Sequence, residues 1–340
     1  MTHSFKSKPE SIVMQVACSL IVSDAVEEGV SVLAPQALDC ETSSLRSSRC
    51  VVHGHSIDLQ RPGFSGRKSD FKTMNGSEVV TAVYDFERHF DQRRALQWMQ
   101  ENWTTSFAFC GLYVVLVFGG QHYMRERPKL NLRWLMVLWS FSLAIFSIMG
   151  ASRTGLYMLR ILTTRGFRHT VCDTRFYTTP VSKFWAFAFA VSKVPELGDT
   201  MFVILRKQRL IFLHWYHHIT VLLYSWYTYK DHVAGGIWFI TINYVVHSFM
   251  YTYYTARAAG LRVPRPCAMI VTAFQIMQMV MGLVVLGLVY RWMHEVHCPS
   301  SIDNVKWGSI MYLSYFVLFT IFFYNSYLRG SSGAKGSKAE

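Results

Sequence analysis

Long apolar runs separated by short polar segments fill the chain from residue 106 onward. A helix that crosses the hydrocarbon core of a bilayer needs roughly 20 mostly apolar residues. Runs of this kind lie at 106–124, 134–152, 183–205, 212–229, 234–256, 267–290 and 307–328. The alternative interpretation is a soluble all-helical protein, but such a protein does not need seven apolar runs of this length. The pattern therefore predicts an all-α integral membrane protein with seven transmembrane helices.

Residues 84–328 form the predicted membrane domain, with an extension before it and a short tail after it. Residues 1–80 are mostly polar around one short apolar run at 12–22, which favours a disordered extension over a signal peptide. The amphipathic pattern from Tyr84 to Trp103 predicts an interfacial helix ahead of the first span. Residues 329–340 are rich in Gly, Ser and Lys and predict a flexible tail.

Composition and charge agree with a membrane protein and predict its orientation. Only 16% of the residues are charged, against about 25% in soluble domains. The formal net charge is +13, and Lys and Arg gather near 125–133, 206–209 and 257–265 and in the tail. The positive-inside rule then predicts a cytosolic C-terminus and a lumenal N-terminus, although arginines in an expected long loop at 153–182 depart from it. Nucleic-acid binding is disfavoured because no basic stripe with interleaved aromatics lies outside the membrane.

Two cysteines and one asparagine are expected on the lumenal side. Cys172 and Cys298 lie where oxidising conditions permit a disulfide, with two free thiols as the alternative. Asn75 begins an Asn-Gly-Ser sequon for N-glycosylation. The seven cysteines of the chain fit no zinc-binding spacing.

Ionisable and amide side chains interrupt four of the apolar runs at helical spacing. Such groups are costly inside a bilayer, so each marks a candidate site. The third run carries Lys193, Glu196 and Asp199, the fourth His214, His217 and His218, the fifth Asn243, His247 and Tyr251, and the sixth Thr272, Gln275 and Gln278. At 100° per residue the three histidines of the fourth run share one face. A structural ion-pair network is the alternative for the third run.

The depth of these groups predicts the kind of molecule that the protein binds. In the predicted orientation all four sets lie toward the cytosolic side, while the lumenal halves of the fourth and sixth runs are apolar. This arrangement predicts a polar chamber open to the cytosol and continued by an apolar tunnel. Such a cavity suits an amphiphile with a charged head and a long tail. Arg206, Lys207 and Arg209 lie at the expected mouth, where they could bind the phosphates of coenzyme A.

Clustered histidines suit either a metal centre or nucleophilic catalysis. The HxxHH spacing occurs in membrane di-iron desaturases and hydroxylases, but two irons need about eight histidines. Only His247 and the three HxxHH histidines lie in the cluster, and although four could hold one zinc, no feature demands it. We therefore predict no metal. Without metal, histidines act near neutral pH as general bases and acyl acceptors. Asn243, Gln275 and Gln278 could donate hydrogen bonds to a thioester carbonyl or an enolate.

Four motifs follow one another in order along the chain. They are KxxExxDT from Lys193 to Thr200, HxxHH from His214 to His218, HxxMY from His247 to Tyr251 and TxxQxxQ from Thr272 to Gln278. Together they resemble the motifs of the fatty acid elongase (ELO) family, and the resemblance runs from Tyr84 to Tyr327. The stretch from Leu210 to Tyr224 looks most like the elongase-six branch, with the elongase-three branch next. The extension at 1–75 departs from the family.

The resemblance implies a condensing enzyme of the endoplasmic reticulum, with six of seven helices forming a barrel around an acyl tunnel. The implied acyltransferase is a 3-oxoacyl-CoA synthase, which condenses malonyl-CoA with a saturated or monounsaturated acyl-CoA of roughly twelve to sixteen carbons. It releases CO2 and coenzyme A and needs no cofactor. The implied partners are membrane lipid, a 3-oxoacyl-CoA reductase, a 3-hydroxyacyl-CoA dehydratase and an enoyl-CoA reductase. Whether the chain forms a homo-oligomer is left open.

For the mechanism, we expect His217 to take the acyl chain as an acyl-imidazole and His247 to assist malonyl activation. His214 and His218 would then orient groups or move protons. Direct attack without an acyl-enzyme is the open alternative. A di-iron desaturase or hydroxylase is the alternative enzyme. A seven-helix receptor or transporter is the alternative of another class, disfavoured because no internal repeat is visible.

Overall fold

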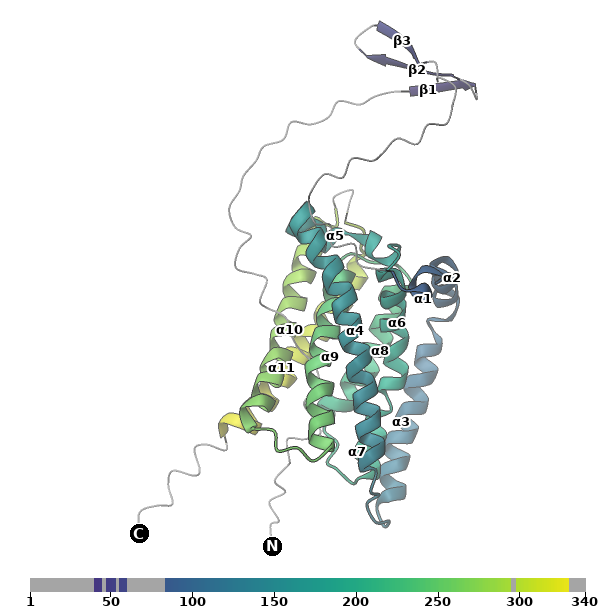
Figure 1. The fold of residues 1–340 in the computed structure, drawn as a ribbon. Coiled ribbons are helices and arrows are strands. Elements are labelled where there is room, and N and C mark those ends of the chain that lie inside the picture. Colours follow the sequence, from purple (N-terminus) through teal and green to yellow (C-terminus); the bar gives the residue numbers. More distant parts are fainter. Residues whose placement is uncertain (1–39, 45–46, 53–54, 60–82, 295–297, 330–340) are drawn as a thin grey trace. The chain divides into compact units, whose positions relative to one another are not determined.

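A computed structural model (Figure 1) describes residues 40–44, 47–52, 55–59, 83–294 and 298–329. The helical region and the segment Asp24–Val80 are separate compact units, and each is described by itself. The predicted glycosylation site at Asn75 and most of the tail lie outside the described residues.

Every predicted apolar run is helical. The helices are α1 (Asp85–Arg88), α2 (Gln92–Asn102), α3 (Thr105–Met124), α4 (Arg133–Arg165), α5 (Phe167–Cys172), α6 (Ser182–Glu196), α7 (Asp199–Leu205), α8 (Phe212–Tyr229), α9 (Gly236–Ala258), α10 (Arg265–Trp292) and α11 (Ile302–Phe323). Two short helical turns, η2 (Thr174–Tyr177) and η3 (Tyr324–Leu328), complete the described helical structure.

Four of the described helices are long and apolar enough to cross a membrane. They are α3, α4, α10 and the continuous rod Ile302–Leu328 formed by α11 and η3. The protein is thus a multi-pass membrane protein, and the predicted spans are supported at four of the seven positions. The third run is divided between α6 and α7, and the histidines and amides of α8 and α9 lower the hydropathy of those helices.

Six helical rods pack in a closed ring. Following the packed neighbours, α4 contacts α6, α6 contacts α8, α8 contacts α11, α11 contacts α10, α10 contacts α9 and α9 contacts α4. Helix α3 packs on the outside against α7 and α8 (Figure 1). At Gly150 of α4 an added Cβ would lie 2.5 Å from the ring of Tyr244 on α9. A small residue here lets these two helices approach closely, as is common between helices in membranes.

The third run breaks where its polar motif begins. Pro195 lies one residue before the end of α6, and α7 starts at Asp199. Proline removes a backbone donor and clashes with the preceding turn, which explains why the helix ends here. A Cβ on Gly198 would lie 3.0 Å from both the Pro195 carbonyl and the ring of Trp139, so the turn between α6 and α7 has room only for glycine.

The two ends of the helical unit differ in chemistry. At one end, called the basic end, Lys207 Nζ donates to the carbonyls of Arg125 and Arg127 at 2.9 and 2.8 Å. Arg133 donates to the carbonyl of Ala259 at the same end. At the other end, called the disulfide end, Cys172 and Cys298 are joined in a disulfide. The predicted partners of the disulfide are therefore bonded to each other in this structure.

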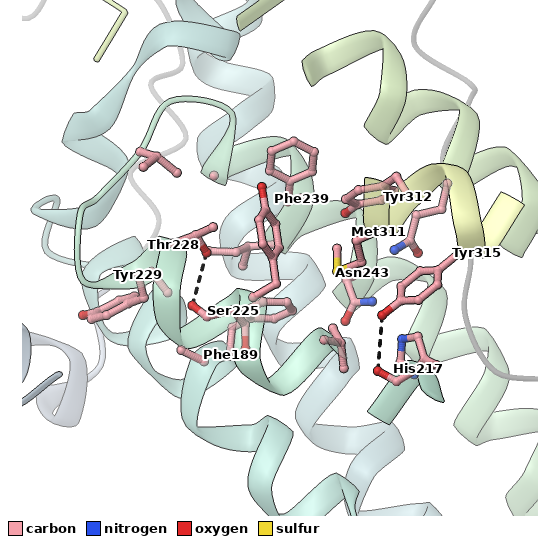
Figure 2. Close-up of a pocket in the computed structure, with 18 of the residues that line it drawn as sticks. Phe189, His217, Ser225, Thr228, Tyr229, Phe239, Asn243, Met311, Tyr312 and Tyr315 are labelled. Carbon is pink, nitrogen blue, oxygen red and sulfur yellow. Dashed lines mark hydrogen bonds between the residues drawn. The ribbon is translucent and has the colours of Figure 1, made fainter. Parts of the chain in front are cut away.

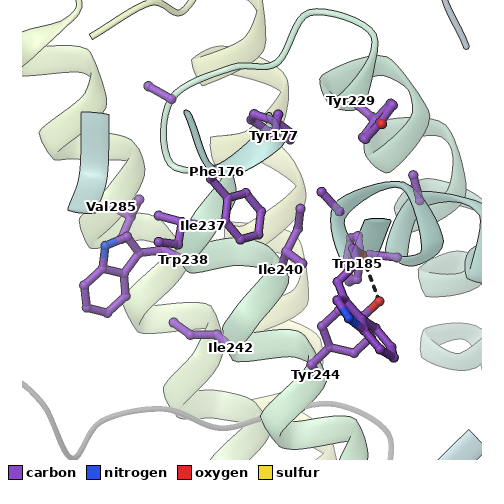
Figure 3. Close-up of a cluster of buried hydrophobic side chains, with 14 of the residues drawn as sticks. Phe176, Tyr177, Trp185, Tyr229, Ile237, Trp238, Ile240, Ile242, Tyr244 and Val285 are labelled. Atoms are coloured by element: carbon purple, nitrogen blue, oxygen red, sulfur yellow. Dashed lines mark hydrogen bonds between the residues drawn. The ribbon is translucent and has the colours of Figure 1, made fainter. Parts of the chain in front are cut away.

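A dense apolar core lies toward the disulfide end (Figure 3). Its largest members are aromatic, and several of them also satisfy their polar atoms. Tyr244 donates its hydroxyl to the Trp185 carbonyl at 3.0 Å, and Trp238 Nε1 donates to the Thr170 hydroxyl at 3.0 Å. Burying an aromatic ring with its polar atom paired avoids the cost of an unmade hydrogen bond.

The prediction of a long loop at 153–182 is wrong over much of that range. Helix α4 continues to Arg165, and α5 and η2 follow it. The charge at Arg153 is tolerated because this arginine is buried against Glu87 of α1, with Nε donating to Glu87 Oε1 at 2.8 Å. Trp185 Nε1 donates to the same oxygen at 2.7 Å. An arginine paired in this way does not end an apolar helix.

Three short strands lie in the N-terminal extension, where the sequence predicts disorder. They are β1 (Cys40–Ser44), β2 (Ser47–Val52) and β3 (His55–Leu59), paired antiparallel in that order. The sequence of β2 and β3 contains β-branched residues, which favour strands. The all-α prediction therefore describes the helical unit and not these residues of the extension.

Candidate active site

The inner faces of the ring carry a buried polar cluster contributed by α6, α7, α8, α9 and α10. Its members are Lys193, Glu196, Asp199, Thr200, His214, His217, His218, Asn243, His247, Thr272, Gln275 and Gln278, all buried. The helical motifs predicted from the sequence thus all face the interior. Burial of so many polar groups in an apolar bundle demands either mutual pairing or a bound polar molecule.

Lys193 and Glu196 form the charged centre of this cluster. Lys193 Nζ lies 2.7 and 3.0 Å from the two carboxylate oxygens of Glu196, and it also donates to Asn243 Oδ1 at 3.1 Å. Ser192 donates to Glu196 at 2.9 Å, and His247 Nδ1 lies 3.9 Å from the carboxylate. The pair therefore links α6 to α9 and places a carboxylate beside His247. The ion-pair interpretation of this motif is realised in the structure.

Asp199 joins three helices through its carboxylate. Trp139 Nε1 of α4 donates to Oδ1 at 2.7 Å, and the Tyr251 hydroxyl of α9 donates to Oδ2 at 2.8 Å. Both carboxylate oxygens are therefore engaged, which fixes α7 against α4 and α9. The sequence marked Tyr251 as part of a motif, while Trp139 carries no motif and was missed.

The three histidines of α8 lie edge to edge. The ring centroids of His214 and His218 are 4.7 Å apart, and those of His217 and His218 are 5.5 Å apart. His214 Nε2 lies 2.9 Å from the Thr200 hydroxyl, which in turn lies 2.7 Å from the hydroxyl of Tyr113 on α3. Tyr113 was also missed, because a tyrosine inside an apolar run looks like an ordinary core residue.

Several polar atoms of the cluster lack a hydrogen-bond partner among the described residues. They are both ring nitrogens of His218, Nε2 of His247, the amide oxygen and nitrogen of Gln275 and the amide oxygen of Gln278. A buried polar atom without a partner costs about 1–3 kcal/mol. Such atoms are available to bond a polar molecule that enters the cluster.

A mainly apolar pocket, called the tunnel, extends from the cluster (Figure 2). His217, Asn243 and Gln278 line its polar part. Its walls are otherwise mainly apolar and aromatic, and they reach Tyr177 and Gly236 near the disulfide end. A narrow apolar cavity with a few polar groups at one place suits a hydrocarbon chain with a polar head.

A second cavity opens at the basic end. Asp199 and His214 line it, together with the guanidinium-bearing side chains of Arg133, Arg206 and Arg257. Arginine binds phosphate in a bidentate way, so this mouth suits a phosphorylated head group.

The predicted phosphate-binding residues are only partly placed at this mouth. Arg206 lines the cavity, whereas Lys207 is exposed and bonded to loop carbonyls, and the exposed Arg209 does not line it. Arg133 and Arg257 do line it. The sequence identified the basic loops that contain Arg133 and Arg257. It could not predict that these two side chains line the same cavity as Arg206.

The donor set of the cluster gives no support to the metal alternatives. No three His, Cys, Asp or Glu side chains within the described part of the chain gather in an arrangement that could hold a metal ion. His214 is hydrogen-bonded to Thr200, and the ring of His217 packs on that of Tyr315 at 4.9 Å.

Comparison with known families assigns these features to one lineage. The model of the ELO family, described as the GNS1/SUR4 family, matches residues 98–335. The chain belongs to this family. All four sequence motifs lie inside the matched region of this ELO protein.

Individual relatives agree with that assignment. The chain is 58% identical to very long chain fatty acid elongase 6 of Homo sapiens over 267 residues, 78% of this chain and 100% of the relative. It is 58% identical to the Gallus gallus protein of the same name, over 77% of this chain and 99% of the relative. Very long chain fatty acid elongase 3 of Homo sapiens is 46% identical over 77% of this chain and 97% of the relative. The predicted order of the two branches, six before three, is confirmed.

Proposed function

We propose that this ELO protein is a fatty acid elongase of the endoplasmic reticulum, an acyltransferase of the 3-oxoacyl-CoA synthase type. It condenses malonyl-CoA with a long-chain acyl-CoA and produces 3-oxoacyl-CoA, CO2 and coenzyme A. The observation that carries the proposal is the position of His217, a buried histidine at the polar part of an apolar tunnel. The names of the relatives support the same reaction class.

The membrane arrangement that we propose has seven spans. The six rods of the ring and the outer helix α3 would cross the bilayer, with α6 and α7 acting together as one broken span. The basic end would face the cytosol, following the positive-inside rule. The end that holds Cys172 and Cys298 would face the oxidising lumen, where a disulfide is stable. The C-terminus would then be cytosolic and the N-terminus lumenal.

The proposed reaction has two stages. An imidazole nitrogen of His217 attacks the acyl-CoA thioester carbonyl, forming an acyl-imidazole and releasing the coenzyme A thiolate, which takes up a proton. Malonyl-CoA then binds and loses CO2. The resulting enolate attacks the acyl carbonyl, forms the new carbon–carbon bond and expels the imidazole. His247 would stabilise the decarboxylating malonyl unit, with Glu196 at 3.9 Å holding the ring in position.

The other polar residues support these two stages without forming bonds to the substrate carbon. The amides of Asn243, Gln275 and Gln278 would donate to the developing oxyanion or enolate, consistent with the unpaired amide nitrogen of Gln275. His218 would shuttle protons, since neither of its ring nitrogens has a protein partner among the described residues. Arg206 would bind coenzyme A phosphates at the basic mouth.

For the substrate, we propose saturated and monounsaturated acyl-CoAs of roughly twelve to sixteen carbons, following the resemblance to the elongase-six branch. The reaction as written needs no cofactor. Its 3-oxo product requires reduction, dehydration and a second reduction to become a longer acyl chain. A 3-oxoacyl-CoA reductase, a 3-hydroxyacyl-CoA dehydratase and an enoyl-CoA reductase are therefore the proposed partners.

The deciding experiment uses the purified full-length protein in detergent with palmitoyl-CoA and radiolabelled malonyl-CoA. We expect labelled 3-oxoacyl-CoA from the wild type and its loss in His217→Ala. His122→Ala, which removes an exposed histidine of α3, is the matched control and keeps the activity. No condensation by the wild type, but oxygen consumption after adding iron and an electron donor, would replace the proposal with a desaturase.

A further inference from the structure

A third cavity lies on the outer side of the helical unit between α3, α8 and α11. We call it the lateral groove. Tyr216, Thr220, Leu223 and Tyr227 line it from α8, and Trp307 and Ile310 line it from α11. Trp307 and Ile310 are 55% and 49% exposed, so the groove opens on a surface that faces the bilayer in the proposed arrangement.

The lateral groove runs alongside the acyl tunnel. On α8 the tunnel is lined by His217, Val221, Tyr224, Ser225, Thr228 and Tyr229. The groove is lined by Tyr216, Thr220, Leu223 and Tyr227, each of which lies one position before a tunnel residue. Neighbouring positions on a helix are 100° apart, so the two cavities use adjacent faces of α8 over about 11 residues, roughly 16 Å. They also share two wall residues, Tyr224 and Met311. A single layer of side chains therefore separates the tunnel from the groove.

This layer is the seam between α8 and α11, and side-chain hydrogen bonds close it. Tyr216 and Ser314 are 2.9 Å apart, Thr220 contacts Tyr315, and the Tyr224 hydroxyl donates to Asn304 Oδ1 at 2.8 Å. The last of these bonds holds Tyr224 in the wall itself.

Because position 308 is a glycine, the side chain of Tyr224 can fill the space between α8 and α11 and separate the tunnel from the groove. A Cβ added at Gly308 would lie 2.3 Å from the Tyr224 hydroxyl, so the tyrosine lies directly on the backbone of α11. The wall at this level is thus a rotatable side chain and not a helix backbone. Side-chain rotation is far faster than the separation of packed helices.

Tyr177 narrows the tunnel at the disulfide end. A Cβ on Gly236 would lie 1.8 Å from the Tyr177 hydroxyl, so the tyrosine is in contact with the backbone of α9 there. A tail whose head is held near His217 can therefore leave the tunnel more easily sideways. The groove also suits a bare hydrocarbon tail better than a phospholipid, because the charged residue that lines it, Asp303, is acidic and repels phosphate.

We propose that the α8–α11 seam is a lateral gate, and that the lateral groove binds the hydrocarbon tail of the acyl substrate or product on its way between tunnel and bilayer. Tyr224 and Met311 are the moving parts of the gate. This proposal rests on the proposed elongase function, because it takes the tunnel to be the acyl site.

The test uses palmitoyl-CoA carrying a diazirine at the end of its tail, with the full-length protein in nanodiscs. After irradiation, mass spectrometry locates the label. We expect label on the tunnel residue Tyr229 and on the groove residue Trp307, both removed by excess unlabelled palmitoyl-CoA. A labelled tunnel with an unlabelled groove overturns the gate. If the groove is labelled but only added phospholipid displaces the label, the gate is also overturned and the groove is a phospholipid site.

Two variants act on the gate in opposite directions. Met311→Trp thickens the wall and should lower the groove-to-tunnel label ratio about fivefold, equivalent to about 1 kcal/mol. Tyr224→Phe removes the bond to Asn304 and should raise the ratio severalfold, so the test does not depend on one variant folding. Leu313→Trp, on the exposed face of α11 outside both cavities, is the control and leaves the ratio unchanged. An unchanged ratio in both gate variants overturns the proposal, whereas an unlabelled tunnel with no condensation refutes the elongase function instead.

Discussion

The Tyr113 hydroxyl lies 2.7 Å from the Thr200 hydroxyl, in the buried space between α3 and α7. Thr200 is also 2.9 Å from His214 Nε2. A hydroxyl has one proton to donate, so the direction of this chain matters. If Tyr113 donates to Thr200, then Thr200 donates to His214, and the histidine proton resides on Nδ1. The reverse direction would leave the buried phenol proton without an acceptor in this chain.

We therefore expect Tyr113→Phe to lower kcat about tenfold, equivalent to about 1.4 kcal/mol, while leaving KM for palmitoyl-CoA unchanged. The phenol does not reach the tunnel, so substrate binding should not depend on it. Steady-state condensation assays check this, with Tyr123→Phe at an exposed position of α3 as control. A changed KM with an unchanged kcat would contradict a role in orienting His214.

The buried pair of Lys193 and Glu196 makes a second prediction, about stability. Glu196→Ala leaves the ammonium of Lys193 buried without its carboxylate, which costs about 3–5 kcal/mol. We expect a large fall in the thermal unfolding temperature of the detergent-solubilised protein. Replacing both residues, Lys193→Met with Glu196→Leu, should restore most of the stability but not the activity, since His247 loses its carboxylate neighbour. A single variant as stable as the double variant would show that the pair is unimportant for folding.

Much of the helical unit could be predicted from the sequence, because apolar length and polar spacing are local properties. The seven runs and the inward direction of the four motifs belong to this class, and a proline such as Pro195 is a local signal for the end of a helix. Contacts between elements far apart in sequence could not be predicted. Tyr113 and Trp139 resemble core aromatics until α7 is packed against α3 and α4. Arg153 seemed to end a span because its partner Glu87 lies 66 residues away.

The buried pair of Glu87 and Arg153 predicts a pH dependence of stability. Burial alone would raise the pKa of Glu87, but hydrogen bonds from Arg153 and Trp185 outweigh it and hold the pKa below its ordinary value of 4.5. A lowered carboxyl pKa contributes stability that is present above the pKa of the unfolded state and is lost as pH falls through the folded value. We expect the unfolding temperature of the wild type to fall below about pH 4.5, with a smaller fall in Glu87→Gln. Thermal scans from neutral to acidic pH check this, and equal pH slopes in the two proteins would contradict it.

The end of the tunnel at Tyr177 predicts which residue limits chain length. Tyr177 is buried, donates to the Val233 carbonyl at 3.3 Å and lies against Gly236 where the tunnel meets the disulfide end. Tyr177→Ala removes the ring and lengthens the apolar space. We expect the ratio of kcat/KM for a twenty-carbon acyl-CoA to that for palmitoyl-CoA to rise about tenfold, the effect of about 1–3 kcal/mol of added apolar contact.

Competition between the two acyl-CoAs in one reaction measures this ratio directly, because both meet the same enzyme at the same malonyl-CoA concentration. Tyr290→Ala, at an exposed tyrosine of α10, is the control and should keep the wild-type ratio. If Tyr177→Ala condenses palmitoyl-CoA normally and still rejects the longer chain, then the limit is set elsewhere along the wall. If it loses both activities while remaining folded, Tyr177 acts on the placement of the acyl group and not on its length.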